Sequence, residues 1–129
     1  MSEQQTPYEL LGGAEGLRAL VDQFYANVAS CSEAEDIRRM HKADMSEVAQ
    51  KLYEYLSGWL GGPGLYMERY GTVCITKPHA PFAIGVAARD QWIYCFRKAL
   101  DDVGVGEEVK AMLHEPIHRI ADFLRNRED

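Results

Sequence analysis

The segment that most constrains the fold is residues 77–92, KPHAPFAIGVAARDQW. Here Pro78 and Pro81 flank His79, and proline both fixes φ and lacks an amide donor. The Pro-His-Ala-Pro tetrapeptide is therefore not expected inside a regular helix or a central strand. The residue before each proline should also avoid the helical region. We expect a short, stiffened segment that holds His79 beside an apolar wall at Phe82. An imidazole held in this way can be an axial ligand of a flat metal cofactor, although a lone histidine more often caps a loop.

Most of the remaining chain carries apolar residues at helical spacing, which predicts an all-α fold in one domain over residues 1–129. The expected helices are residues 6–11, 14–29, 37–41, 46–60, 65–69, 84–103 and 107–124. Glycines at 12–13 and the Gly-Gly-Pro-Gly sequence at 61–64 break the pattern. Residues 73–75 could be a strand, but an isolated strand has no pairing partner, so we expect a loop. Pro116 should kink or interrupt the last helix.

Composition excludes several classes of protein. A chain of 129 residues with 47% apolar and 26% charged residues suits one globular core. Its net charge of -6 argues against a general nucleic-acid binder and against anionic membrane surfaces. No window has the ~20 apolar residues that span a bilayer, and the N-terminal residues do not resemble a secretory signal.

The cysteines indicate a reducing compartment. Cys31, Cys74 and Cys95 are odd in number and have no CxxC spacing, so neither a zinc site nor a disulfide framework is expected. A cytoplasmic location fits, with each cysteine as a buried or partly buried free thiol rather than a reactive one. Cys74 lies in a predicted loop, however, and could be exposed and open to oxidation. His114 and His118 are four residues apart on a helix, a spacing that can chelate a metal. No third ligand is evident nearby, so a solvated face is expected.

A helical domain with this many apolar stripes either packs them together or encloses a cofactor. Residues of the types that line pockets come from five different segments, and they include a potential ligand, aromatic groups and several side chains with one polar tip. They are Tyr25, His41, Val48, Leu52, Tyr55, His79, Phe82, Trp92 and Phe96. This surplus favours a pocket, although a helical stripe of aromatic residues is more often core.

A set of motifs occurs in a fixed order along the chain. They are Gly12-Gly13, Phe24-Tyr25, Ile37-Arg38-Arg39, Gly61-Gly62-Pro63 followed by Tyr66, His79-Ala80-Pro81-Phe82, and Arg89-Asp90-x-Trp92 with Cys95. In this order and spacing the chain resembles the truncated haemoglobins, specifically the bacterial 2/2 globins of group II, or O type. The resemblance extends from Tyr8 to about Leu124.

The resemblance implies a two-over-two helical sandwich around haem b, iron protoporphyrin IX, with His79 as the proximal ligand through Nε2. Tyr25 and Trp92 then act as distal donors to a bound diatomic ligand. Val48 lies where many globins have a distal histidine, and valine cannot donate a hydrogen bond. His41 departs from the phenylalanine or tyrosine usual in the family. It could donate a third N–H to the ligand or bond the Tyr25 hydroxyl, and His41 or Tyr25 could bind iron directly when no gas is present.

The resemblance also implies further haem contacts. Leu52, Tyr55, Leu56, Phe82 and Phe96 would form the pocket wall, with Trp92 along the haem, and Lys51, Tyr66, Arg69 and Lys77 are candidates to pair with its propionates. Each of these polar residues could equally be a solvated surface side chain.

The function implied is binding of O2, NO and CO, with slow oxygen release and possible reaction with NO or peroxide, rather than an enzyme with defined catalytic residues. An unidentified reductase that recycles the iron is then a possible partner, and the chain should be a monomer or a weak homodimer. The alternative is a haem-free globin-like sensor or interaction module. Colour distinguishes the two, because a haem protein has a strong Soret band.

Overall fold

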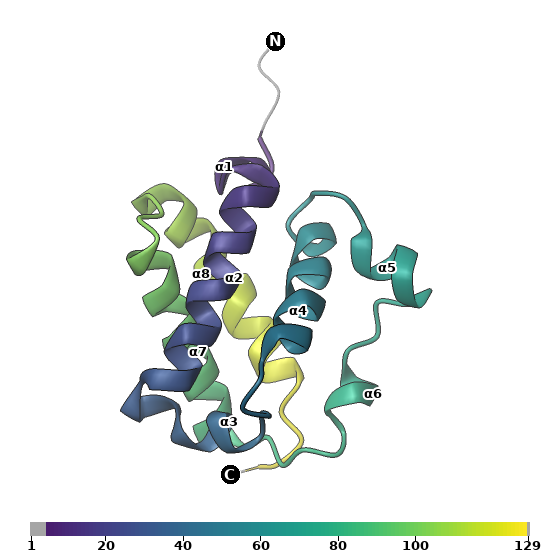
Figure 1. Cartoon of the computed structure of the whole chain (residues 1–129), viewed down its shortest axis with the longest axis vertical. Coiled ribbons are helices and arrows are strands. Elements are labelled where there is room, and N and C mark those ends of the chain that lie inside the picture. Colours follow the sequence, from purple (N-terminus) through teal and green to yellow (C-terminus); the bar gives the residue numbers. More distant parts are fainter. Residues whose placement is uncertain (1–4, 129) are drawn as a thin grey trace.

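In the computed structural model, which describes residues 5–128, the chain forms helices joined by short loops (Figure 1). No β-strand occurs among these residues, which confirms the predicted all-α class. The helices are α1 (Pro7–Leu10), α2 (Gly13–Ser30), α3 (Glu35–Arg39), α4 (Ser46–Trp59), α5 (Leu65–Tyr70), α6 (Thr76–His79), α7 (Val86–Asp102) and α8 (Glu107–Phe123), with a 3-10 turn η1 (Ser32–Ala34) before α3.

The four long helices form the body of the fold. α2 packs against both α4 and α7, and α7 also packs against α8 (Figure 1). The apolar stripe of α2 is buried at the centre of this arrangement, with Leu17, Leu20, Val21, Phe24 and Val28 almost inaccessible to solvent. Since α2 contacts two of the other three long helices, its stripe provides most of the shared core.

Two glycine clusters allow, respectively, a sharp turn and a close approach that other residues would prevent. Gly12 and Gly13 both have positive φ, 100° and 70°, which lets α1 turn sharply into α2. Gly61 also has positive φ, and a Cβ on Gly62 would lie 2.5 Å from the ring of Tyr8 in α1. The start of α1 therefore rests directly on the connection between α4 and α5, where the Tyr8 amide donates to the carbonyl of Leu60 at 3.0 Å.

The structure corrects the expectation for the Pro-His-Ala-Pro segment. Pro78 and His79 lie inside the short helix α6 rather than outside any helix. Proline is tolerated there because the first-turn amides of a helix have no intrahelical acceptor, so the missing N–H costs nothing. Ala80 precedes Pro81 and yet has φ −55° and ψ −35°, in the helical region, so the expected avoidance of that region was also wrong.

Three helix boundaries differ from the predicted ones. α3 begins at Glu35 and ends at Arg39, two residues earlier than expected at both ends. α7 begins at Val86 instead of residue 84, after Gly85 in an extended conformation. Separately, the expected interruption of the last helix at Pro116 does not occur, because α8 continues through this residue. The remaining predicted helices are confirmed to within one residue at each end, and residues 73–75 are a loop, as predicted.

Candidate functional site

His79 is the last residue of α6, and one of its two ring nitrogens is hydrogen-bonded to the backbone while the other is not. Its Nδ1–H donates to the carbonyl of Ile75, one helical turn earlier, at 2.5 Å. A carbonyl can only accept, so the proton lies on Nδ1, and in the neutral ring Nε2 keeps its lone pair. The side chain is half-buried. This is the tautomer that a metal-binding imidazole adopts when a backbone carbonyl orients it.

Tyr25 presents a phenol from the buried face of α2. The residue is 8% exposed, and its ring packs edge-on against Phe24 with centroids 4.8 Å apart. Burial raises the pKa of Tyr25 far above the usual value, so the side chain stays a neutral phenol. No described residue hydrogen-bonds its hydroxyl, and no fully buried side-chain polar atom lacks a partner in the described part of the chain. The oxygen therefore borders accessible space and is free to donate.

His41 lies next to Tyr25, with ring centroids 5.8 Å apart in an edge-on arrangement. Its Nδ1–H donates to the carbonyl of Ile37 at 2.7 Å. The neutral ring thus offers only a lone pair at Nε2. Of the roles left open by the sequence, this bond disfavours donation to a ligand and favours acceptance from the Tyr25 hydroxyl.

A polar frame fixes the helix that carries His41. Gln91 of α7 accepts the backbone N–H groups of Asp36 and Ile37 through Oε1, at 2.9 and 3.3 Å, and its Nε2 donates to the Asp36 carboxylate. Arg38 donates to the carbonyls of Val28 and Cys31 at the end of α2. The Gln91 cap also explains the early start of α3, because no residue near α3 in sequence provides it.

The aromatic rings of α2 and α7 pack together around Trp92. Trp92 stacks on Phe96 with ring centroids 5.3 Å apart and an interplanar angle of 16°, and the Phe24 ring centroid lies 5.2 Å from that of Trp92. Phe96 is fully buried and so contributes to the core as well as to this stack. Leu56 is likewise core, whereas Val48, Leu52, Tyr55 and Trp92 are only partly buried, and Phe82 is 39% exposed.

The polar candidates for the propionates have varied surroundings. Arg69 donates from Nη1 to both carboxylate oxygens of Glu54, at 3.1 and 3.3 Å. Lys51 lies 3.6 Å from Glu47 at the surface. Tyr66 packs against Tyr55. Lys77 is exposed on α6, two residues before His79.

The C-terminal segment clamps the loop between α6 and α7. Asn126 donates from Nδ2 to the carbonyl of Phe82 at 2.7 Å and accepts the Ile84 amide at 2.8 Å. The amides of Asn126 and Arg127 both donate to the Ile84 carbonyl. Sequence reasoning missed Asn126, because an asparagine after a helix end carries no signal of a partner 42 residues earlier. Its contacts hold the chain directly after His79.

The arginine of the Arg-Asp-x-Trp motif is structural. Arg89 donates to Asp122 at 2.7 Å and to Asp90 at 3.0 Å, and these carboxylates raise its pKa. The contact ties the start of α7 to the end of α8. Within the motif, Arg89 and Gln91 therefore position helices, and Trp92 is the residue that faces the aromatic cluster.

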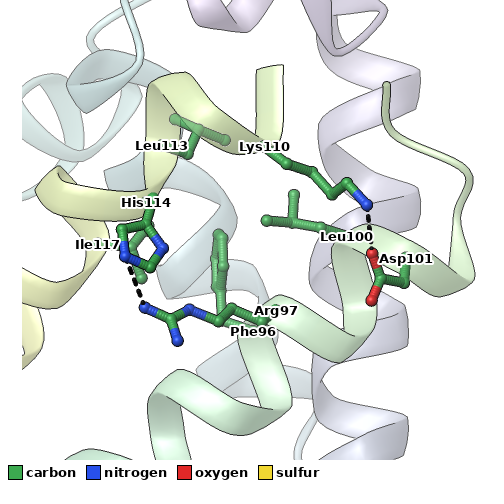
Figure 2. Close-up of a pocket in the computed structure, with 8 residues that line it drawn as sticks. All are labelled: Phe96, Arg97, Leu100, Asp101, Lys110, Leu113, His114 and Ile117. Carbon is green, nitrogen blue, oxygen red and sulfur yellow. Dashed lines mark hydrogen bonds and ion pairs between the residues drawn. The ribbon is translucent and has the colours of Figure 1, made fainter. Parts of the chain in front are cut away.

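A separate cavity lies between α7 and α8 and is lined by the eight residues shown in Figure 2. The Arg97–His114 and Lys110–Asp101 contacts lie at its polar edge (Figure 2). Its volume of about 180 Å³ is below the roughly 300–1,000 Å³ of typical cofactor sites. Of the residues predicted to contact haem, Phe96 alone lines it, so this cavity is distinct from the candidate site.

The cysteines only partly follow the prediction. Cys95 is buried and Cys31 half-buried, as expected, but Cys74 is exposed. Its exposure decides between the two alternatives that the sequence left open for this loop cysteine. Hydrogen bonds from Thr76, followed by the Lys77 backbone, lower the pKa of the Cys74 thiol. His114 and His118 are exposed, as predicted. The described residues contain no cluster of metal-ligating side chains of three or more, and none of their helices is long and apolar enough to cross a membrane.

The arrangement fits an iron porphyrin. His79 offers a free Nε2 lone pair from α6, and the phenol of Tyr25 belongs to the buried core against which the partly buried Val48, Leu52 and Trp92 pack. These side chains would bury further apolar area against a flat apolar ring. No acidic side chain is needed at such a site, since a single neutral histidine suffices to hold haem iron.

Comparisons with known proteins agree with this reading. The family model for bacterial-like globins matches residues 6–126. The group 2 truncated hemoglobin YjbI of Bacillus subtilis is 35% identical over 94% of this chain and 89% of its own length. The group II 2-on-2 hemoglobin of Agrobacterium tumefaciens superposes with a TM-score of 0.92, with 38% identity and 98% of each chain covered. A cold-adapted truncated hemoglobin of Pseudoalteromonas haloplanktis TAC125 gives 0.91, with 35% identity over 96% of this chain and 100% of that one.

The helical order, the oriented imidazole of α6 and these similarities lead to one assignment. The chain belongs to the bacterial-like globin family and, within it, to the group II truncated haemoglobins, which are haem-based oxygen-binding proteins with the two-over-two helical fold.

Proposed function

We propose that this protein binds haem b through Nε2 of His79 and holds O2, NO or CO on the side of Tyr25. The observation that carries the proposal is the hydrogen bond from His79 Nδ1 to the Ile75 carbonyl, which leaves Nε2 directed away from its own helix backbone. Haem held by one neutral histidine supplies an open coordination position for a diatomic ligand. Lys51, Tyr66, Arg69 and Lys77 remain the candidates for the propionates, with Arg69 already engaged by Glu54.

The distal side combines two donors, Tyr25 and Trp92, with one acceptor, His41 Nε2, which competes with a bound ligand for the single proton of the Tyr25 hydroxyl. The Tyr25 phenol stays protonated, because burial raises its pKa, and so it can donate to a ligand that carries partial negative charge. His41 Nε2 accepts from the phenol or leaves it free, and the Trp92 indole N–H is a further donor. Val48 and Leu52 keep the surroundings apolar, which strengthens such hydrogen bonds. The dissociation rate of oxygen should therefore be low. The ratio of the oxygen rate to the CO rate should also be lower than in a pocket without hydrogen-bond donors.

Slow release suits a scavenger or sensor better than a carrier. Oxygen that stays bound can meet NO, and the balanced outcome is O2 + NO + one electron giving nitrate. The electron has to come from a reductase, which is the partner we propose. Reduction of peroxides is a second activity that the same site would allow. The three cysteines form no disulfide, which favours a reducing compartment such as the cytoplasm, and we propose a monomer or weak homodimer.

Stopped-flow oxygen dissociation tests the distal part of this proposal. Replacing Tyr25 by phenylalanine removes the hydroxyl and keeps the ring that packs on Phe24. A hydrogen bond to a charged group is worth about 1.5–3 kcal/mol, so dissociation should be about tenfold faster or more. Equal rates in the wild type and Tyr25→Phe would remove Tyr25 from the account.

A second substitution separates the two roles of His41. If His41 acts by accepting from the Tyr25 hydroxyl, His41→Phe should change dissociation in the wild type and have little further effect in Tyr25→Phe. An equal effect of His41→Phe in both backgrounds would instead mean that His41 donates directly to the ligand.

A further inference from the structure

Three tyrosine rings follow one another from α4 to the surface of α5, the helix beside α4 in Figure 1. Tyr55 of α4 is partly buried, and its ring lies edge-on to that of Tyr66, with centroids 5.6 Å apart. The centroids of the Tyr66 and Tyr70 rings lie 4.6 Å apart. Tyr70 is 37% exposed. The rings thus connect Tyr55, which the resemblance implies is part of the haem pocket wall, with the solvent.

An ion pair holds the outer part of this chain of rings in place. Arg69 binds the carboxylate of Glu54, which is only 7% exposed, and so ties α5 to α4. The Arg69 guanidinium also lies 5.4 Å from the centroid of the Tyr70 ring, within the range of a cation–π contact. At the inner end, burial and then the neighbouring Tyr66 raise the pKa of Tyr55, so this ring is a neutral phenol.

We propose that Tyr55, Tyr66 and Tyr70 carry electrons from a small phenolic reductant at the α5 surface to the haem while a hydroperoxide is reduced. The inference rests on the proposed haem function. Transfer between rings in contact is faster than one long step through the protein. Each tyrosine in turn gives up one electron, and its phenolic proton passes to water. The next ring outward then returns the electron, and water returns the proton.

The overall reaction balances. The O–O bond of the hydroperoxide breaks, and two electrons and two protons convert it to an alcohol and water. Two molecules of the phenolic reductant each supply one electron and one proton and become phenoxyl radicals. Without a reductant, the oxidation remains on the outermost ring, where two Tyr70 radicals from different molecules couple through a carbon–carbon bond to a covalent dityrosine, and the two displaced ring hydrogens are transferred as protons to the phenoxyl oxygens.

Tyr94 provides a matched control. It is 39% exposed, almost the same as Tyr70, but it lies on α7 and packs on no other aromatic ring among the described residues. If exposure alone decided which tyrosine is oxidised, both would react alike. If the chain of rings decides, Tyr70 should react in preference.

The experiment treats the haem-loaded ferric protein with hydrogen peroxide, without reductant. Tyrosyl radicals are followed by electron paramagnetic resonance, dityrosine by fluorescence, and the modified positions by peptide mass spectrometry. We expect several-fold more cross-link at Tyr70 than at Tyr94. Tyr70→Phe should remove most of the covalent dimer, Tyr94→Phe should leave it, and Tyr66→Phe should lower the yield per bound haem even though Tyr70 is retained.

The outcomes separate the two proposals. Equal modification of Tyr70 and Tyr94 in the wild type would overturn the electron path and leave oxygen binding intact. The same holds if the Soret band is present but peroxide produces no radical. A chain without a Soret band would overturn both proposals.

Discussion

A backbone carbonyl one turn upstream sets the chemistry of both histidines of the site. His79 and His41 each donate from Nδ1, to Ile75 and Ile37 respectively. The same bond gives them different uses, because His79 is left with a lone pair for a metal and His41 with a lone pair for a neighbouring phenol. Both residues are candidates from the sequence alone, but tautomers depend on carbonyl positions that residue types do not reveal.

Cys74 offers a test at the same scale. Its hydrogen bonds to Thr76 and the Lys77 backbone stabilise the thiolate and lower the thiol pKa, while burial raises the pKa of Cys95 to about 11. At neutral pH Cys74 should therefore be alkylated by iodoacetamide well before Cys95. As the pH rises, the alkylation rate of Cys74 should reach its plateau at a lower pH than that of an ordinary thiol, whose pKa is about 8.5. Peptide mass spectrometry over a pH series measures both. Thr76→Val should move the plateau to higher pH, and an unchanged profile would contradict the assigned cause.

At the scale of elements, the site is held by contacts from distant helices. Gln91 of α7 caps α3, Arg89 of α7 binds Asp122 of α8, and Asn126 clamps the loop after α6. Apolar spacing predicted where most helices lie, because each stripe is local in sequence. The start of α3 and the loop after His79 could not be predicted in this way, since their partners lie 55 and 42 residues away.

Asn126→Ala tests the clamp. It removes the two side-chain hydrogen bonds that Asn126 makes to the loop, one to the Phe82 carbonyl and one from the Ile84 amide. Each is worth about 0.5–1.5 kcal/mol. Hydrogen exchange of the Ile84 amide should become faster, and haem should be lost faster to an excess of apomyoglobin. Asn126→Asp keeps the acceptor for Ile84 but loses the donor to Phe82, so it should fall between the wild type and alanine. If the Ile84 amide exchanges equally fast in Asn126→Ala, the clamp is not significant in solution.

On the scale of the whole molecule, the body made by α2, α4, α7 and α8 is densely buried, whereas α5 and α6 contain no fully buried residue. This difference explains which parts of the site were predictable. The core positions Phe24, Leu56 and Phe96 follow from helical stripes, while the surroundings of Arg69 and Tyr66 depend on how α5 rests on α4. A ligand that binds only the folded chain stabilises it, so bound haem should order the side of the molecule that carries His79.

The most direct measurement is the absorption spectrum of His79→Gly, with His118→Ala as a control at an exposed histidine. Our account predicts that His79→Gly lacks the ferrous Soret band and gas binding of the wild type, and that added imidazole restores both by occupying the vacated position. His118→Ala should match the wild type. An unaltered Soret band and unaltered oxygen binding in His79→Gly without imidazole would contradict the claim that His79 holds the iron.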